Sequence, residues 1–133
     1  MDPILHLSLP VRDLDECKRF YVEQLGCDLA RERDGFIDVW FYGLQLTLQQ
    51  HPEQVLAPED RGVRHFGVTL GADELRELLT RLDASGVEWV SRVRTDCAGT
   101  SQEQTKAKIA DPSGNVIELK TYADPNKVFA RRG

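Results

Sequence analysis

Apolar and polar residues alternate at the start of the chain and then change to a helical spacing. In residues 4–11 a leucine or valine stands at every second position, with His6 between two leucines, which predicts a half-buried strand. In residues 13–25 the apolar positions recur every three or four residues, which is typical of a helix with one buried face. Asp13 is suited to cap the start of this helix, and Gly26 is suited to end it.

Three short strands are predicted after the helix, and the whole order then occurs a second time. The Asp34-Gly35 turn and Gly43 separate these strands, which cover residues 27–32, 36–42 and 44–49. The second copy consists of a strand, a helix ended by Gly86 and three more strands, over residues 65–70, 72–84, 88–93, 104–110 and 116–122. Such an internal repeat indicates a duplicated βαβββ unit.

The repeat predicts an α+β fold made of two tandem βαβββ modules. We expect the modules to form a curled mixed sheet, a cup, with the helices on its outer face. The predicted boundaries within a single domain of residues 1–133 are module one at 4–50, a linker at 51–63, module two at 64–122 and a tail at 123–133. The linker is assigned because it is polar, contains two prolines and shows no periodicity.

Length and composition agree with one compact domain and exclude several classes of function. The chain has 133 residues, of which 41% are hydrophobic and 29% charged, so it can bury a sizeable core. Its net charge is −5 and its basic residues are scattered, which argues against a nucleic-acid surface. No apolar run approaches the ~20 residues that cross a bilayer, so no membrane association is expected. The cysteines, Cys17, Cys27 and Cys97, lack metal-type spacing and are predicted to be reduced, buried thiols of a cytoplasmic protein.

Four predicted strands carry a potential metal ligand on the side away from their apolar residues. These ligands are His6, Gln45, His65 and Glu118. If the sheets curve toward one concavity, two imidazoles, an amide oxygen and a carboxylate converge, and this donor set suits Mn, Fe, Co, Ni or Zn. The four residues lie on separate strands, without a local motif such as HExxH. Surface histidines beside a solvated glutamine and glutamate are therefore the alternative interpretation.

Three segments of the chain carry a family resemblance. They are Ile4-Leu5-His6 through Phe20-Tyr21 to Leu25-Gly26, then His65-Phe66-Gly67-Val68, and then Asp111-Pro112-Ser113-Gly114-Asn115-Val116-Ile117-Glu118-Leu119. Together they resemble the vicinal oxygen chelate superfamily, which contains glyoxalases, bleomycin resistance proteins and extradiol dioxygenases. The resemblance covers residues 4–122 and is that of a glyoxalase-like single-domain protein. The paired βαβββ units of this superfamily agree with the internal repeat.

The resemblance implies one divalent metal ion per site, held by His6, Gln45, His65 and Glu118. An acidic ligand is common in glyoxalase I where Gln45 stands, so this set is more similar to that of methylmalonyl-CoA epimerase. In that family a second carboxylate lies on the preceding strand, and Asp38 has a comparable place. The predicted catalytic base is therefore Glu118 or Asp38, with a solvent-facing surface residue as the alternative for Asp38.

These residues predict a divalent-metal-dependent lyase or isomerase of the glyoxalase or epimerase kind. Such an enzyme stabilises an enediolate-type intermediate on a small oxygenated substrate. A metal-free small-molecule binding or resistance protein and a small Fe(II) extradiol-type dioxygenase are the alternatives. The resemblance also implies a homodimer, whose metal ligands come from one subunit or from both.

Further residues around the cup are predicted to contact the substrate. They are Trp40, Tyr42, Gln104, Lys106 and Tyr122. For the aromatic pair Trp40 and Tyr42, a dimer or sheet-packing contact is the alternative. Lys106, together with Lys108, could hold an anionic substrate or form a solvated basic edge.

Overall fold

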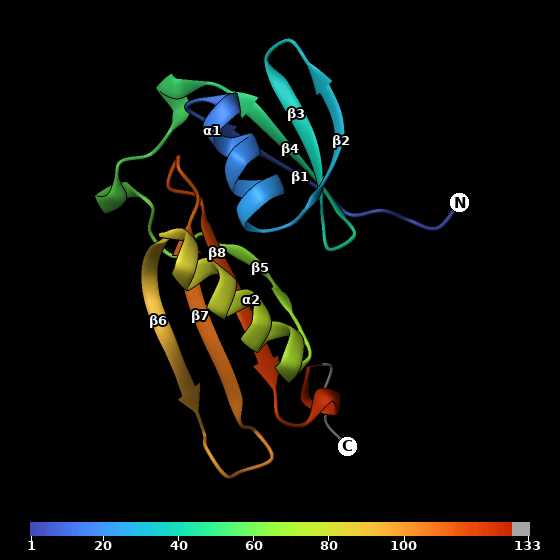
Figure 1. Ribbon diagram of the computed structural model, residues 1–133, viewed down its shortest axis with the longest axis vertical. Helices are drawn as coiled ribbons and strands as arrows, with labels where there is room; N and C mark the ends of the chain where they lie inside the picture. Colours follow the sequence, from blue (N-terminus) through green and yellow to red (C-terminus); the bar gives the residue numbers. More distant parts are fainter. Residues whose placement is uncertain (129–133) are drawn as a thin grey trace. The chain divides into compact units, whose positions relative to one another are not determined.

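The computed structural model describes residues 1–128, so residues 129–133 of the predicted tail lie outside the described part. The chain divides into two compact units, and Figure 1 shows a first βαβββ order in blue to green and a second in green to red. Unit 1 consists of Met1–Arg64 together with Ala110–Asn115. Unit 2 consists of His65–Ile109 and the residues from Val116 onward.

Unit 1 contains a four-stranded sheet in the order β1-β4-β3-β2. Strand β1 is parallel to β4, whereas β3 is antiparallel to both β4 and β2. The helical segment after β1 contacts β3 and β4. In chain order the elements are β1 (His6–Val11), α1 (Leu14–Lys18), a π-helix (Arg19–Gln24), β2 (Asp28–Arg33), β3 (Phe36–Phe41) and β4 (Leu44–Gln50).

The helix predicted over residues 13–25 has the expected ends and an unexpected interior. Asp13 caps it by accepting from the backbone N–H groups of residues 15 and 16, and Gly26 follows it with φ +80°. The segment is helical as predicted, but its second part is a π-helix rather than an α-helix, and the N–H of Leu25 donates to the carbonyl of Phe20. Phe20 and Tyr21 are both buried within this wider turn.

Unit 2 repeats the order, with its sheet arranged β5-β8-β7-β6 and with β5 parallel to β8. Helix α2 contacts β8 and ends at Gly86 with φ +76°. The elements are β5 (Phe66–Thr69), α2 (Ala72–Ser85), β6 (Glu88–Asp96), β7 (Gln104–Ala110) and β8 (Val116–Tyr122). The α+β class with two tandem βαβββ modules is therefore confirmed. Short 3-10 helices, Pro52–Gln54 and Pro58–Asp60, lie in the predicted linker, and Pro125–Lys127 follows β8.

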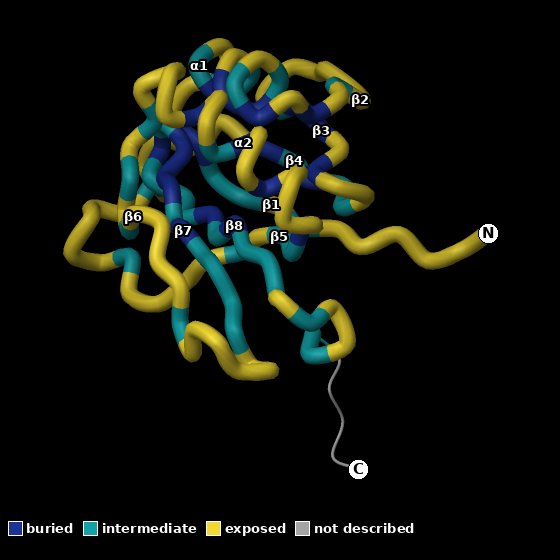
Figure 2. Tube along the Cα trace, turned by 60° about the horizontal axis from the view of Figure 1, so that its bottom comes forward, coloured by how far each residue is buried: buried dark blue, intermediate teal, exposed yellow. Residues whose placement is uncertain are grey.

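Each unit has its own apolar core. Most of the buried positions, dark blue in Figure 2, come from the helical segment, β3 and β4 in unit 1 and from α2, β7 and β8 in unit 2. Cys17 and Cys27 are buried as predicted, but Cys97 is exposed in the turn after β6, so the prediction for that thiol was wrong. Within residues 1–128 no helix is long and apolar enough to cross a membrane.

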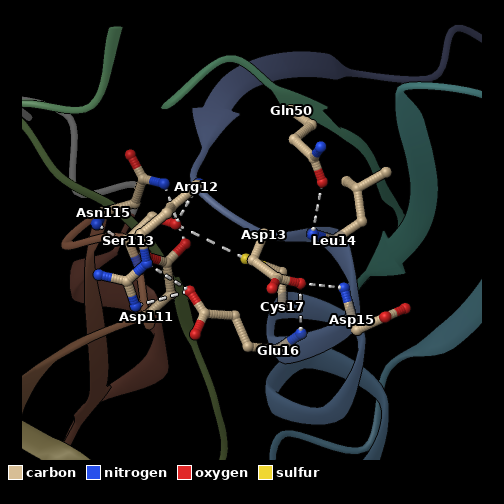
Figure 3. A network of polar contacts seen from close by, with 10 residues as sticks. All are labelled: Arg12, Asp13, Leu14, Asp15, Glu16, Cys17, Gln50, Asp111, Ser113 and Asn115. Atoms are coloured by element: carbon tan, nitrogen blue, oxygen red, sulfur yellow. Dashed lines mark hydrogen bonds and ion pairs between the residues drawn. The ribbon is translucent and has the colours of Figure 1, made fainter. Parts of the chain in front are cut away.

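The turn between β7 and β8 belongs to unit 1 and is fixed there by hydrogen bonds. The Tyr21 hydroxyl donates to the buried Asp111 carboxylate at 2.7 Å. The Arg12 N–H donates to the Ser113 hydroxyl at 2.8 Å, and the Asn115 amide donates both to Asp111 and to the carbonyl of Pro10. Figure 3 shows this turn beside the start of α1.

Candidate functional site

The two predicted ligands of unit 1 lie directly opposite each other on the parallel pair β1 and β4. His6 is in register with Gln45, and the His6 Nδ1 atom lies 3.2 Å from the main-chain oxygen of Gln45. A carbonyl oxygen cannot donate, so in the neutral ring the proton of this hydrogen bond belongs to Nδ1. That tautomer leaves the lone pair of Nε2 available to a metal ion, which is the usual arrangement of a histidine ligand.

A buried carboxylate lies beside this pair, on the central strand β3. Asp38 accepts from the Thr47 hydroxyl at 2.5 Å and from the Arg31 guanidinium at 2.8 Å, and the Gln45 amide nitrogen lies 3.5 Å from the same carboxylate. Its exposure is 1%, so the solvent-facing alternative for Asp38 is wrong. Burial raises the pKa of Asp38, but the hydrogen bonds from Thr47 and Arg31 outweigh it and hold the pKa below its usual value.

The predicted ligands of unit 2 also lie near each other. His65 directly precedes β5, Glu118 is on β8, and the His65 Nε2 atom is 3.8 Å from one Glu118 carboxylate oxygen. The Glu118 side chain is only 13% exposed, which excludes a freely solvated glutamate. Strands β5 and β8 approach closely here, since a Cβ atom added to Gly67 would lie 1.9 Å from the Glu118 carbonyl oxygen.

Two lysines bring positive charge to Glu118. The Lys120 Nζ atom lies 3.4 Å from one carboxylate oxygen, and the Lys108 Nζ atom lies 3.9 Å from the other. A cavity of about 250 Å³ adjoins these groups. It is lined by the segment from His65 to Thr69 and by Glu118 and Lys120 of β8.

The predicted substrate contacts have different surroundings. Trp40 is half exposed and in register with Gln45, so it lies beside the ligand pair of unit 1. Tyr42 is not in a strand as predicted, because it occupies the turn after β3 with φ +50°, and its ring packs edge-on against Phe41. Tyr42 and the following glycine both have positive φ, as a two-residue hairpin turn requires.

The remaining three predicted contacts lie in unit 2. Gln104 begins β7 and is half buried. The Lys106 ammonium binds Asp96 at 2.8 Å, and this hydrogen bond lowers the pKa of Asp96. The Tyr122 ring lies under the Lys120 ammonium, at 5.6 Å from its centre. Lys120 was not predicted as a site residue. Its position, two residues from both Glu118 and Tyr122 on β8, places it on the same strand face as these predicted residues.

The donor atoms of unit 2 are spaced as a first-row metal ion requires. Two atoms that each bind such an ion at about 2.1 Å lie no more than about 4.2 Å apart. The 3.8 Å between His65 Nε2 and Glu118 satisfies this limit. In unit 1 the Gln45 amide directs its NH₂ group to Asp38, and its side-chain carbonyl oxygen is the atom of this amide that could bind a metal ion. Within residues 1–128 no three His, Cys, Asp or Glu side chains are gathered into one metal-binding group.

The family model and the solved structures that match this chain point to the same family. The family model described as glyoxalase/bleomycin resistance protein/dioxygenase superfamily matches residues 3–119. A solved structure described as a glyoxalase/bleomycin resistance protein/dioxygenase from Alicyclobacillus acidocaldarius is 31% identical, with a TM-score of 0.83 over 92% of this chain and 93% of that one. No curated protein matches the chain.

Two more distant structures share the fold. The fosfomycin resistance protein FosX from Listeria monocytogenes is 18% identical, with a TM-score of 0.75 over 91% of this chain and 93% of that one. A lactoylglutathione lyase from Agrobacterium tumefaciens is 19% identical, with a TM-score of 0.65 over 91% of this chain and 94% of that one.

Proposed function

We propose a function from the premise that this chain belongs to the glyoxalase/bleomycin resistance protein/dioxygenase superfamily, whose members typically use a divalent metal ion. The proposed function is that of a metal-dependent lyase or isomerase that moves a proton next to a carbonyl of a small oxygenated substrate. One observation carries it: each unit places an imidazole beside an oxygen donor at a parallel pair of strands, with His6 and Gln45 opposite each other on β1 and β4, and His65 directly before β5 near Glu118 on β8.

These four residues would together hold one Mn, Fe, Co, Ni or Zn ion. When bound, such an ion supplies a Lewis acid for the negative charge that develops on substrate oxygen as the neighbouring carbon loses its proton. We further propose that the protein is a homodimer, so that the four ligands belong either to one subunit or to two.

Glu118 is the proposed base. Its carboxylate adjoins a cavity of about 250 Å³, which is suited to a small substrate, so a substrate proton can come within its reach. Asp38 is less suited to take up a proton, because the hydrogen bonds from Thr47 and Arg31 stabilise its charged form. We therefore assign Asp38 a positioning role, in which its carboxylate orients the Gln45 amide.

The remaining predicted contacts define the pocket walls in this proposal. Trp40 supplies an aromatic face next to Gln45, and Tyr122 supplies one next to Lys120. Gln104 offers an amide that can orient the substrate. Lys106 and Tyr42 take outer positions, since the first is bound by Asp96 and the second lies in a turn.

Metal content tests the proposal directly. The purified, untagged protein is loaded with Mn, Fe, Co, Ni or Zn, dialysed and analysed by plasma mass spectrometry. We expect about one ion per site in the wild type and little in His6→Ala or His65→Ala. The control His51→Ala removes the third histidine, which is exposed and pairs with Glu53, and it is expected to keep the metal. Asp38→Asn is expected to weaken metal binding about tenfold, as loss of an orienting carboxylate usually does.

Mixing two inactive variants tells whether one subunit or two supply the ligands. His6→Ala and His65→Ala subunits are unfolded together and refolded. If each site draws one pair from each subunit, a mixed dimer regains one intact site, and metal binding returns in part. If each site lies within one chain, no mixture regains it.

Two results would overturn the proposed function. Failure to retain any of the five metals would leave the metal-free binding function of the family. Retention of iron alone, with oxygen consumed on catechol, would assign a dioxygenase instead. Exchange of a substrate α-proton with solvent deuterium by the metal-loaded protein, lost in Glu118→Gln, is the expected catalytic signature.

A further inference from the structure

The surroundings of Glu118 carry more positive than negative charge. Lys120 and Lys108 each approach one oxygen of this carboxylate, at 3.4 and 3.9 Å. Among residues 1–128, Glu118 is the one carboxylate paired with either lysine. Two ammonium groups therefore share a single negative charge, and one positive charge is left uncompensated.

The neighbouring lysine on β7 has a different partner. Lys106 forms an ion pair of 2.8 Å with Asp96, and its charge is neutralised there. Lys108 and Lys120 differ from this pattern, because they share one carboxylate. In an ordinary solvated basic edge each lysine has its own. The excess charge lies next to the cavity of about 250 Å³, which Lys120 and Glu118 help to line.

We propose that Lys108 and Lys120 form an anion-binding subsite beside Glu118, and that the substrate carries a carboxylate or phosphoryl group which these lysines bind. This inference deepens the proposed function and rests on it for the identification of the anion as part of the substrate. The side chains of Lys108 and Lys120 are 35% and 30% exposed, so their ammonium groups remain accessible to a ligand. The Tyr122 ring under Lys120 restrains that ammonium near the cavity.

The same charges predict a coupling with the metal ion. Two ammonium groups near a carboxylate ligand repel a cation that binds this carboxylate. A negatively charged substrate group that pairs with the lysines removes this repulsion. Because such coupling is reciprocal, the anion and the cation strengthen each other's binding. The lysines thereby favour binding of the metal ion together with an anionic substrate over binding of the metal ion alone.

Anion binding to the metal-free protein is the first test. Inorganic phosphate and malonate are titrated separately by isothermal calorimetry, with 1,3-propanediol as an uncharged probe. We expect one saturable site for at least one anion and none for the diol. Preference for phosphate assigns a phosphoryl group, and preference for malonate assigns a carboxylate. Lys108→Gln and Lys120→Gln are each expected to weaken binding about tenfold, because each removes a charge-assisted contact.

Two further variants separate charge from structure. Lys120→Arg keeps the positive charge and is expected to keep anion affinity within about threefold. Lys18→Gln is the matched control, because Lys18 also pairs with a glutamate, Glu32, at 2.7 Å but belongs to unit 1. Its anion affinity is expected to equal that of the wild type. Thermal unfolding checks that every variant is folded.

Titration with Mn²⁺ alone provides a readout that does not depend on activity. Without added anion, Lys108→Gln and Lys120→Gln are expected to bind Mn²⁺ at least about fivefold more tightly than the wild type, since a nearby positive charge is gone. Equal phosphate and malonate affinities in wild type and both glutamine variants would overturn the subsite, even if Mn²⁺ binds normally. Lysine-dependent anion binding without any metal binding would instead retain the subsite and overturn the proposed function.

Discussion

The two compact units place the carboxylates of Asp38, Asp111 and Glu118 in different environments. In unit 1, Asp38 and Asp111 are both buried and accept hydrogen bonds from several neighbouring groups. In unit 2, Glu118 keeps a partial exposure, adjoins a cavity and faces two lysine ammonium groups at distances too long for close hydrogen bonds. The two sheets nevertheless have the same strand arrangement, β1-β4-β3-β2 and β5-β8-β7-β6.

This difference separates two uses of a carboxylate in the two units. A buried carboxylate with complete hydrogen bonding stabilises the local structure and orients neighbouring groups, as Asp38 does for Gln45. A carboxylate with loosely held partners can exchange them for a ligand. In the proposed function, unit 1 positions ligands and unit 2 binds the charged group of the substrate, and substitutions in each unit can test this division.

Gly67→Ala is expected to have the largest effect on stability. The added Cβ would meet the Glu118 carbonyl oxygen at 1.9 Å, so β5 and β8 would have to separate. We expect a loss of at least about 3 kcal/mol in the free energy of unfolding, measured by urea denaturation. Ser8, the equivalent position in unit 1, carries a side chain that accepts a hydrogen bond from Gln49. The equivalent strand pair of unit 1 therefore has room for a side chain at this position.

Gly71→Ala is the matched control for that substitution. A Cβ added at Gly71 meets nothing within 4 Å, and its φ of −64° suits any residue. Its effect is expected to stay within about 1 kcal/mol, because only the N-terminal cap of α2 changes. Equal stabilities of Gly67→Ala and Gly71→Ala would contradict the tight packing of β5 on β8.

The second largest effect is expected from Asp111, which fixes the turn Ala110–Asn115 to unit 1. Asp111→Ala leaves the Tyr21 hydroxyl and the Ser113 N–H without their acceptor, at an expected cost of about 2 kcal/mol in the free energy of unfolding. The control is Asp124→Ala, since Asp124 accepts from the N–H of Asn126 in an exposed turn. That variant is expected to lose no more than about 0.5 kcal/mol.

The sign of the pH dependence at Asp111 is a further part of this prediction. Burial raises the pKa of Asp111 in the folded state, although its hydrogen bonds act in the opposite direction. The folded protein therefore holds this proton more tightly than the unfolded chain, whose aspartate pKa is about 3.9. The contribution of Asp111 to stability is present below that unfolded value and is lost as the pH rises through the folded pKa. Asp111→Asn should remove this loss, and parallel pH profiles of the two proteins would contradict the prediction.

Much of the fold was predictable from the sequence because alternation and capping are local signals. The bounds of β7 and β8 agree with the predicted strands, and Asp13, Gly26 and Gly86 mark the helix ends as expected. The π-helix was not predictable, since its hydrogen bonds shift by one residue without changing which residues are apolar. The docking of the turn at Asp111 on unit 1 depends on contacts distant in the sequence.

For the candidate site, the sequence predicted which strand face each residue lies on, but not which side chains contact each other. Alternation placed Gln45 on the strand face away from the leucines, but the contact of Asp38 with Arg31 depends on the register between β2 and β3. A register shift between Leu29 and Arg31 places the guanidinium opposite Asp38 and buries the carboxylate. The approach of Lys120 to Glu118 could not be predicted either. Periodicity gives the strand face of a lysine, but not the direction in which its long side chain extends over that face.

The smallest effect on stability is expected from Cys97→Ser. This variant allows the thiol reactivity of unit 1 to be measured without that of unit 2. Cys97 is exposed in unit 2, whereas Cys17 and Cys27 are buried in unit 1. Burial raises the pKa of Cys17 to about 12, so at pH 8 that thiol has almost no reactive thiolate. We expect one rapidly reacting thiol with Ellman's reagent in the native protein and none in Cys97→Ser. The free energy of unfolding should change by less than about 0.5 kcal/mol.

Guanidinium chloride provides the control for this last experiment, because all three thiols of the wild type should react once the chain is unfolded. A rapid reaction of Cys17 or Cys27 in native Cys97→Ser would mean that the unit 1 core opens readily. Asp38 and Asp111 would then be exposed to water in the same fluctuations, since they belong to the same unit. Slow reaction of both buried thiols therefore supports the assignment of unit 1 as the rigid, positioning half of the scaffold.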